Sequence, residues 1–268
     1  MKVIINQKNF KKALGVVEKV VAKNTALPIL NNILFKTENG RLRLSATNLE
    51  IGINYMIGAK IEEVGQVAVP ARIISDFAGN VSDEKITLIV KNNVLSINSE
   101  HYKTQILGFD AKDFPIIPKI KSKPLAIVAI KALKNSLMSV LDSAALSEAR
   151  PELAGIFVSF DNDRIVFAST DSFRLTEKQF DFKNPTKQSF IIPRNTVLEL
   201  VRIGGDLDGD IIVNLGDNQI SFSNDDFEMV SRLVDGAYPD YKKVIPERFI
   251  SRVLVNKNDL EKNIRLAG

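Results

Sequence analysis

The sequence predicts an α+β protein built from tandem copies of one domain, and three observations support this prediction. The segment ILFKTENGRLRLSAT at residues 33–47 returns as IFVSFDNDRIVFAST at residues 156–170, at an offset of 123 without a gap. Short segments centred on Pro70 and Pro193 recur at the same offset. Alternating apolar and polar residues on either side of short turns indicate antiparallel strands. A repeat of this length implies that each copy folds as a domain.

Each copy has the pattern of a doubled β-α-β-β-β unit. Residues 41–46 and 85–90 alternate between apolar and polar side chains, as strands with one buried face do. Asn39-Gly40 and Asn92-Asn93 are hairpin turns, because asparagine and glycine tolerate the positive φ that such turns need. The two prolines predict helix starts, where their missing N–H costs no hydrogen bond. We therefore expect antiparallel sheets with helices on one face.

A third copy begins near the end of the chain. Residues 253–256, with Leu260 and Ile264 after them, repeat residues 3–6, Phe10 and Leu14 at an offset of 250. Since one repeat spans roughly 120 residues, we expect that roughly 100 residues of this copy are missing, as in a truncated product. The predicted domains are residues 1–122, 123–246 and 247–268, the last being the beginning of a third domain.

The composition excludes several classes of protein. The chain has 268 residues, 45% of them hydrophobic, and no cysteine, so disulfide frameworks and thiolate metal sites are excluded. No apolar run has transmembrane length, and the N-terminus lacks a signal-peptide core. We expect a cytoplasmic protein with no membrane partner. The net charge of +4 is compatible with nucleic acid but decides little.

The first expected helix, over about residues 8–21, has one apolar and one basic face at 100° per residue. The apolar arc holds Phe10, Ala13, Leu14, Val17, Val20 and Val21, and the basic arc holds Lys8, Lys11, Lys12 and Lys19. Such a face is either a solvated surface or a surface for a polyanion. In the second copy the matching face has fewer basic residues, because Asn135 and Asp142 replace two of the lysines.

Two arginines lie at the predicted helix starts. Arg72 and Arg194 closely follow the prolines, and Arg202 comes two turns after the second. Free N–H groups at a helix start suit a phosphate, although each arginine also fits an ordinary exposed position.

The residues supply little for catalysis, and we expect neither an enzyme nor a cofactor or metal site. His101 lies in a segment that alternates like a strand, without a nearby nucleophile, and is predicted to be an ordinary strand residue. The acidic loop at residues 204–210 lacks the glycine and glutamate of a calcium loop. Two alternatives stay open: a metal-dependent phosphohydrolase that uses Asp206, Asp208 and Asp210, and a peptide-binding scaffold without DNA.

Four segments together resemble a known family. They are TALPILNNI at 25–33, SATNLEI at 45–51, STDSFRL at 169–175 and LVDGAYPDY at 233–241. In this combination and order the whole chain resembles the bacterial DNA polymerase III beta subunit, the sliding clamp. The resemblance implies three copies of one domain per subunit and a homodimeric ring around double-stranded DNA. It also implies helices that line the hole and, as partners, DNA polymerase III subunits, the clamp loader and other proteins with clamp-binding motifs.

The resemblance implies DNA contacts in addition to the lysines of the first helix. Such contacts neutralise phosphates and need no base readout, so the duplex can slide. The positions implied are Lys23, Asn24, Arg72, Arg150, Arg194 and Arg202.

The resemblance also implies a peptide groove for partner proteins. Taken without the family, the apolar members are better explained as core residues. Phe173 stands where the family usually has histidine. The positions implied are Leu153, Thr170, Ser172, Phe173, Arg174, Leu175, Pro239, Lys243 and Val244.

Overall fold

The computed structural model describes residues 1–268 except 23–25, 148, 162, 184–185, 206 and 268. Internal contacts divide the chain into two compact units, Met1–Gly236 and Ala237–Gly268. The first unit contains both complete copies of the repeat, and the second is short.

The first repeat has ten helices and strands joined by short 3₁₀ helices. In chain order these elements are β1 (Lys2–Asn6), α1 (Gln7–Val17), η1 (Glu18–Val20), η2 (Pro28–Asn31), β2 (Asn32–Glu38), β3 (Arg41–Thr47), β4 (Ile51–Glu63), β5 (Gln66–Pro70), α2 (Ala71–Asn80), β6 (Lys85–Lys91), β7 (Val94–Asn98), β8 (Lys103–Leu107) and η3 (Ala111–Asp113).

The second repeat has the same order of strands and helices, which confirms the predicted doubled unit. Its elements are β9 (Pro124–Ala129), α3 (Ile130–Leu141), β10 (Gly155–Asp161), β11 (Arg164–Thr170), β12 (Leu175–Asp181), β13 (Gln188–Pro193), α4 (Arg194–Ile203), β14 (Asp210–Leu215), β15 (Gln219–Ser223) and β16 (Phe227–Arg232).

The predicted turns and helix starts are confirmed. Asn39, Gly40, Asn92 and Asn93 have positive φ values of 50°, 74°, 48° and 61° and connect β2 to β3 and β6 to β7. Both prolines immediately precede their helices, α2 and α4. The local chemistry of turns and caps therefore fixes these boundaries.

Helix α1 is amphipathic as predicted but shorter than the expected 8–21. The Asn6 side chain caps its start by accepting hydrogen bonds from the backbone N–H groups of Lys8 and Asn9, at 3.0 and 3.3 Å. The chain tightens into η1 after Val17 and becomes extended at Val21. The predicted core residues from Phe10 to Val20 are buried, whereas Val21 is only half-buried.

A twelve-stranded sheet joins the two repeats. Its main order is β8-β7-β6-β1-β4-β16-β15-β14-β9, with β2, β3 and β5 attached through β3 and β4. The long strand β4 pairs with β1 through residues 59–63 and with β16 through residues 51–55, antiparallel in both cases. The remaining strands form a separate sheet in the order β12-β11-β10-β13. The β4–β16 pairing joins the strands of the two repeats within the unit Met1–Gly236.

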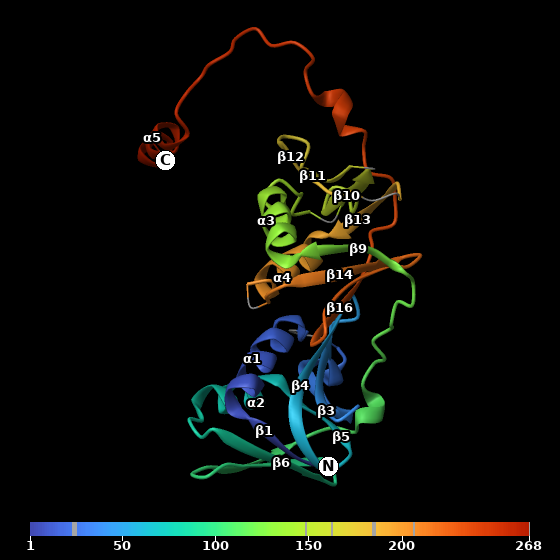
Figure 1. Ribbon diagram of the computed structural model, residues 1–268, viewed down its shortest axis with the longest axis vertical. Coiled ribbons are helices and arrows are strands. Elements are labelled where there is room, and N and C mark those ends of the chain that lie inside the picture. Colours follow the sequence, from blue (N-terminus) through green and yellow to red (C-terminus); the bar gives the residue numbers. More distant parts are fainter. Residues whose placement is uncertain (23–25, 148, 162, 184–185, 206, 268) are drawn as a thin grey trace. The chain divides into compact units, whose positions relative to one another are not determined.

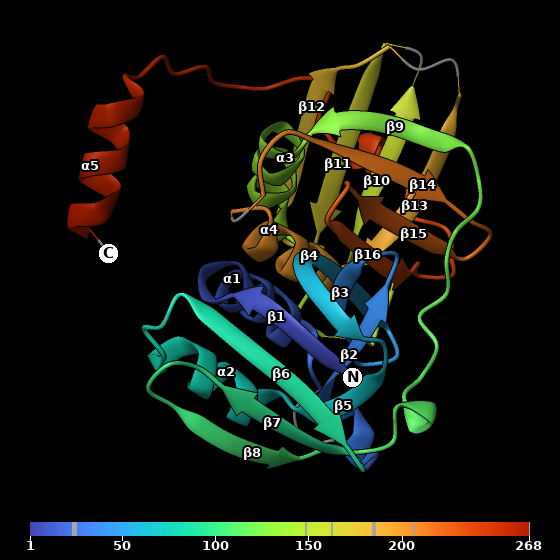
Figure 2. The ribbon, with the colours of Figure 1, turned by 60° about the horizontal axis from the view of Figure 1, so that its bottom comes forward.

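The helices of this unit lie together. Helix α1 packs beside α2, and α3 packs beside α4. Both ribbon views place α1, α2, α3 and α4 next to one another along one side of the unit, with β6, β7 and β8 running close to α2 (Figures 1 and 2). The predicted class, α+β with helices on one face of antiparallel sheets, is confirmed.

The second unit contains η4 (Tyr241–Val244) and α5 (Lys257–Ala267). The Asn256 side chain accepts hydrogen bonds from the N–H groups of Asn258 and Asp259, at 2.9 and 3.4 Å. Asn6 caps α1 in the same way at an offset of 250, so α5 begins as the third copy of this helix would. Within the described residues, every helix is too short or too polar to cross a membrane.

Candidate nucleic-acid interface and peptide site

The basic face predicted for α1 is exposed. Lys8, Lys11 and Lys12 are solvent-exposed on α1, and Lys19 is partly exposed on η1. Neither Lys8 nor Lys12 forms an ion pair with a residue that the structure describes. Gly15 also lies on the exposed side of the helix. This surface offers cations that are not neutralised by the protein itself.

Two of these lysines also interact with the C-terminal ends of other helices. Lys11 Nζ donates to the carbonyl oxygen of Gly79, at the end of α2, over 3.1 Å. Lys19 Nζ donates to the carbonyl oxygen of Arg202, in the last turn of α4, over 3.4 Å. Helix C-termini carry unpaired carbonyl groups and a partial negative charge, which a cation stabilises. Sequence reasoning missed this role, because the partners lie 68 and 183 residues away.

The predicted arginines have different surroundings. Arg72 is almost fully exposed, with its Nε 4.0 Å from an Asp76 carboxylate oxygen. Arg202 is exposed and pairs with Glu199 at 3.0 Å, and Arg150 is exposed in a turn. Arg194 is only half-exposed, with its Nε buried and without a hydrogen bond. Lys23 and Asn24 lie outside the described residues, so the proposed contacts of both remain predictions.

The loop at residues 170–174, part of the predicted peptide site, is held by its own side chains. Asp171 Oδ1 accepts hydrogen bonds from the N–H groups of Phe173 and Arg174, both at 3.0 Å, and Asp171 Oδ2 accepts from Arg174 Nε. Thr170 Oγ1 accepts from Ser172 N and donates to the carbonyl oxygen of Arg174. Phe173 is 97% exposed, so this ordered loop presents an aromatic ring to solvent.

The hydrogen bonds of this loop recur in the first repeat. Asn48 Oδ1 accepts from the N–H groups of Glu50 and Ile51, and Thr47 Oγ1 accepts from Leu49 N and donates to the carbonyl oxygen of Ile51. Leu49 and Ser172 occupy matching positions with φ values of 75° and 77°. A threonine followed by an asparagine or aspartate is the sequence signal of such a turn, and Asp171 could have been found from it.

The other predicted peptide residues are divided between the two units. Leu153 is 4% exposed, as a core residue would be, and Leu175 is half-buried. Pro239, Lys243 and Val244 belong to the second unit, where all three are exposed. Their part in a peptide site stays a prediction.

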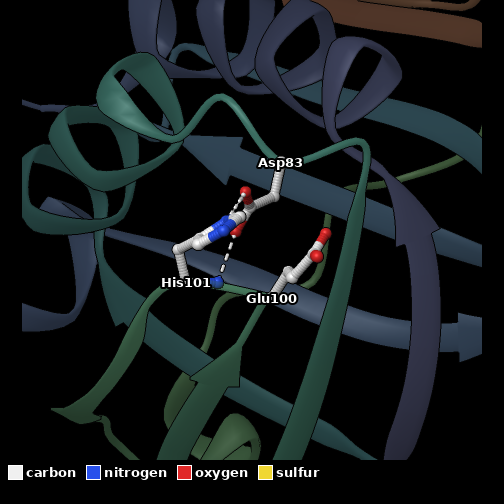
Figure 3. A group of neighbouring side chains, drawn as sticks. All are labelled: Asp83, Glu100 and His101. Atoms are coloured by element: carbon white, nitrogen blue, oxygen red, sulfur yellow. Dashed lines mark hydrogen bonds and ion pairs between the residues drawn. The ribbon is translucent and has the colours of Figure 1, made fainter.

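His101 was predicted to be a strand residue, and this prediction is wrong. It lies in the bend between β7 and β8, where its Nδ1 is 2.7 Å from Asp83 Oδ1 and its backbone N–H donates to Asp83 Oδ2 (Figure 3). Hydrogen bonds from Ser99 and His101 lower the pKa of Asp83 to about 2, and Asp83 in turn raises the pKa of His101. Glu100 completes a group of three possible metal ligands, in which both carboxylate oxygens of Asp83 already contact His101.

The acidic loop offers little to a metal ion. Asp208 is exposed and pairs with Lys131 at 3.4 Å, Asp210 begins β14, and Asp206 lies outside the described residues. Among the described residues, potential ligands converge in threes only at Asp83, Glu100 and His101. The described part of the loop therefore gives no geometric support to a metal-dependent phosphohydrolase.

Comparisons with known proteins decide the family. The family described as DNA polymerase III beta subunit, N-terminal domain, matches residues 1–118, and the one described as its central domain matches residues 127–240. The chain belongs to the DNA polymerase III beta subunit family. A beta sliding clamp of Buchnera aphidicola is 30% identical over 271 residues, covering 100% of this chain and 74% of the relative. A beta sliding clamp of Synechocystis is 28% identical, and the match covers 97% of this chain and 73% of the relative.

Solved structures of DNA polymerase III beta subunits have the same fold as this chain. A putative subunit from Eubacterium rectale superimposes with a TM-score of 0.95 at 26% identity, covering 100% of this chain and 73% of that one. A sliding clamp from Bartonella birtlesii, bound to griselimycin, superimposes with a TM-score of 0.84 at 31% identity. The match covers 92% of this chain and 68% of that one. The predicted sliding-clamp function is confirmed, and these relatives do not support the phosphohydrolase alternative.

Proposed function

We propose that this member of the DNA polymerase III beta subunit family encircles duplex DNA without sequence preference, in a homodimeric ring of the full-length subunit. The observation that carries the proposal is the placement of α1–α4 on one side of the unit, with exposed lysines on α1 (Figure 2). In its cytoplasmic setting the ring tethers DNA polymerase III subunits, the clamp loader and other proteins with clamp-binding motifs. Its role is to hold these partners, and it has no reaction of its own.

The proposed domains are residues 1–122, 123–246 and 247–268, the last being the opening of a third copy. The repeated element order supports the first division. The matching asparagine caps of α1 and α5 support the third copy.

DNA binding in this proposal is electrostatic. Lys8 and Lys12 face solvent without an acidic partner among the described residues, so a phosphate can approach them at little cost. Each neutralised phosphate releases condensed counterions, and the affinity therefore falls steeply with salt. Contacts of this kind carry no base information, which suits a ring that must move along DNA.

Peptide docking in this proposal uses the loop at residues 170–174. The turn is already ordered by Asp171 and Thr170, so little conformational entropy is lost when a partner contacts Phe173. An exposed aromatic ring on a rigid turn is a suitable anchor for a short apolar motif.

The test of encirclement is topological. The full-length protein is loaded onto nicked circular plasmid and separated by gel filtration before and after linearisation of the plasmid. We expect retention on the circle and loss from the linear form. Equal retention on both would refute encirclement and leave ordinary electrostatic binding.

A nuclease and phosphatase assay with magnesium separates this proposal from the phosphohydrolase alternative. We expect no turnover above that of a blank preparation. Turnover that disappears in Asp208→Asn would instead assign the acidic loop a catalytic role.

A further inference from the structure

A pocket of about 420 Å³ lies on the face of the first-repeat sheet that points away from α1. Two cross-strand rows form its floor. One row consists of Gln66, Lys36 and Arg43 on β5, β2 and β3, and the other of Leu34, Ser45 and Asn54 on β2, β3 and β4. The segment Phe114–Lys119, which we call the strap, forms its wall.

The strap is held at two points, so the pocket is a built feature of the fold. Phe114 is 6% exposed and packs in a small apolar cluster with Leu34 and Ala68. Ile117 rests on Gly52 so closely that a Cβ at Gly52 would lie 2.7 Å from its Cγ2. Prolines at 115 and 118 restrict the backbone between and after these contacts.

The charged residues that line this pocket are all basic, whereas the adjoining pocket, which shares Arg43, Asn54 and Lys119 with it, is also lined by Glu38, Asp225, Asp226 and Glu228. The lining of the first pocket includes Lys36, Arg43 and Lys119 and no acidic residue. Lys36 and Arg43 are direct cross-strand partners, an arrangement of like charges that is unfavourable by itself. Glu38, outside the lining, pairs with Arg43 Nη1 at 2.5 Å and compensates one of the three charges.

Two donor groups in the pocket lack partners. Arg43 Nε is buried and makes no hydrogen bond. Lys36 is half-exposed and makes neither a hydrogen bond nor an ion pair with any described residue. Lys36 can therefore bind an anion without giving up a partner within the protein.

We propose that this pocket binds a small phosphomonoester. A phosphomonoester carries a charge of about −2 near neutral pH and three acceptor oxygens. This matches the side chains of Lys36 and Lys119, which form no ion pair with a described residue. Leu34, Phe114 and Ile117 supply an apolar wall for the organic part, and the volume lies within the range of small-molecule sites. The site is separate from the α1 surface and does not rest on the proposed DNA function.

The test is isothermal titration calorimetry with AMP as the probe. We expect saturable binding of AMP, weaker binding of inorganic phosphate and no binding of adenosine. Loss of one charge-assisted contact weakens binding about tenfold, so we expect this effect in Lys36→Gln and in Lys119→Gln. Circular dichroism melting checks that the variants fold.

Matched controls separate the pocket from other basic surfaces. Lys112 lies on η3 close to the strap but does not line the pocket, and Lys12 lies on α1. We expect Lys112→Gln and Lys12→Gln to bind AMP like the unchanged protein. No saturable binding of AMP, or binding that survives the double variant Lys36→Gln/Lys119→Gln, would overturn the proposal.

Discussion

Lys19 Nζ lies 3.4 Å from the carbonyl oxygen of Arg202, so a lysine of the first repeat caps a helix of the second. On the strand side, Arg41 reaches across the same junction and hydrogen-bonds to Asp226 and to the carbonyl oxygen of Asp225. The junction between the repeats is thus held on both its helix side and its strand side. The basic residues proposed to bind DNA are therefore of two kinds. Lys11 and Lys19 also form contacts within the protein, whereas Lys8 and Lys12 form no ion pair with a described residue.

The lysines without protein partners give the cleanest test of the DNA proposal. We expect the double variant Lys8→Gln/Lys12→Gln to weaken duplex binding and to lower the slope of log K against log salt by about 2, one for each phosphate contact. Fluorescence anisotropy with a short duplex at several salt concentrations measures this. Lys91 and Lys178 are exposed on strands, so Lys91→Gln/Lys178→Gln is the control, and an equal effect there would contradict the proposal.

Lys11 should contribute to stability through its contact with the end of α2. Replacing it by methionine keeps most of the apolar stem and removes the charge from the Gly79 carbonyl. We expect Lys11→Met to lower the free energy of unfolding by about 0.3–1 kcal/mol, the usual value for a cation at a helix C-terminus. Lys12→Met serves as the control in urea unfolding, and an equal loss in both variants would exclude the cap.

The pair of Asp83 and His101 predicts a pH dependence with a definite sign. The hydrogen bond to Asp83 raises the pKa of His101 above its usual 6.5. The contribution of His101 to the stability of the fold is therefore complete below pH 6.5 and disappears as the pH rises through the higher pKa of the folded state. The hydrogen bonds from Ser99 and, to a smaller extent, from His101 lower the pKa of Asp83 from 3.8 to about 2. The contribution of Asp83 to the stability of the fold is therefore complete above pH 3.8 and disappears as the pH falls toward 2. The pair stabilises the bend most between these limits.

The measurement is direct, because the chain has one histidine. We expect the ring-proton NMR signals of His101 to titrate above pH 6.5 in the unchanged protein and at a lower pH in Asp83→Asn. A midpoint at or below 6.5 in the unchanged protein would show that the contact between Asp83 and His101 is absent in solution.

The sequence predicts the repeat, the hairpins and the buried face of α1, because each depends on residues close together in the chain. The pairing of β4 with β16 escaped prediction, since strand partners more than 170 residues apart leave no local signal. The failure at His101 has the same cause, because its alternating surroundings resemble a strand until Asp83 is brought beside it. For Lys11, the sequence predicts the exposed face but not the helix end that it contacts.

Asp171 is predicted to support peptide binding without being a surface anchor itself. In Asp171→Ala the N–H groups of Phe173 and Arg174 lose their acceptor, and the backbone that presents Phe173 is less well held. We expect about fivefold weaker binding of a synthetic clamp-binding peptide in calorimetry, equivalent to about 1 kcal/mol. Asn48→Ala removes the same hydrogen bonds from the matching loop of the first repeat, and peptide affinity should remain unchanged there.

Gly52 and Ile117 provide a test of the contact that holds the strap. A methyl group at position 52 would overlap Ile117 Cγ2, so the strap must move or the sheet must distort. We expect Gly52→Ala to lower the free energy of unfolding by about 1–3 kcal/mol, as overpacking does. In Gly52→Ala/Ile117→Ala the overlap is gone, and the two substitutions together should cost less than the sum of their separate effects. Additive losses in urea unfolding would mean that Ile117 does not rest on Gly52 in solution.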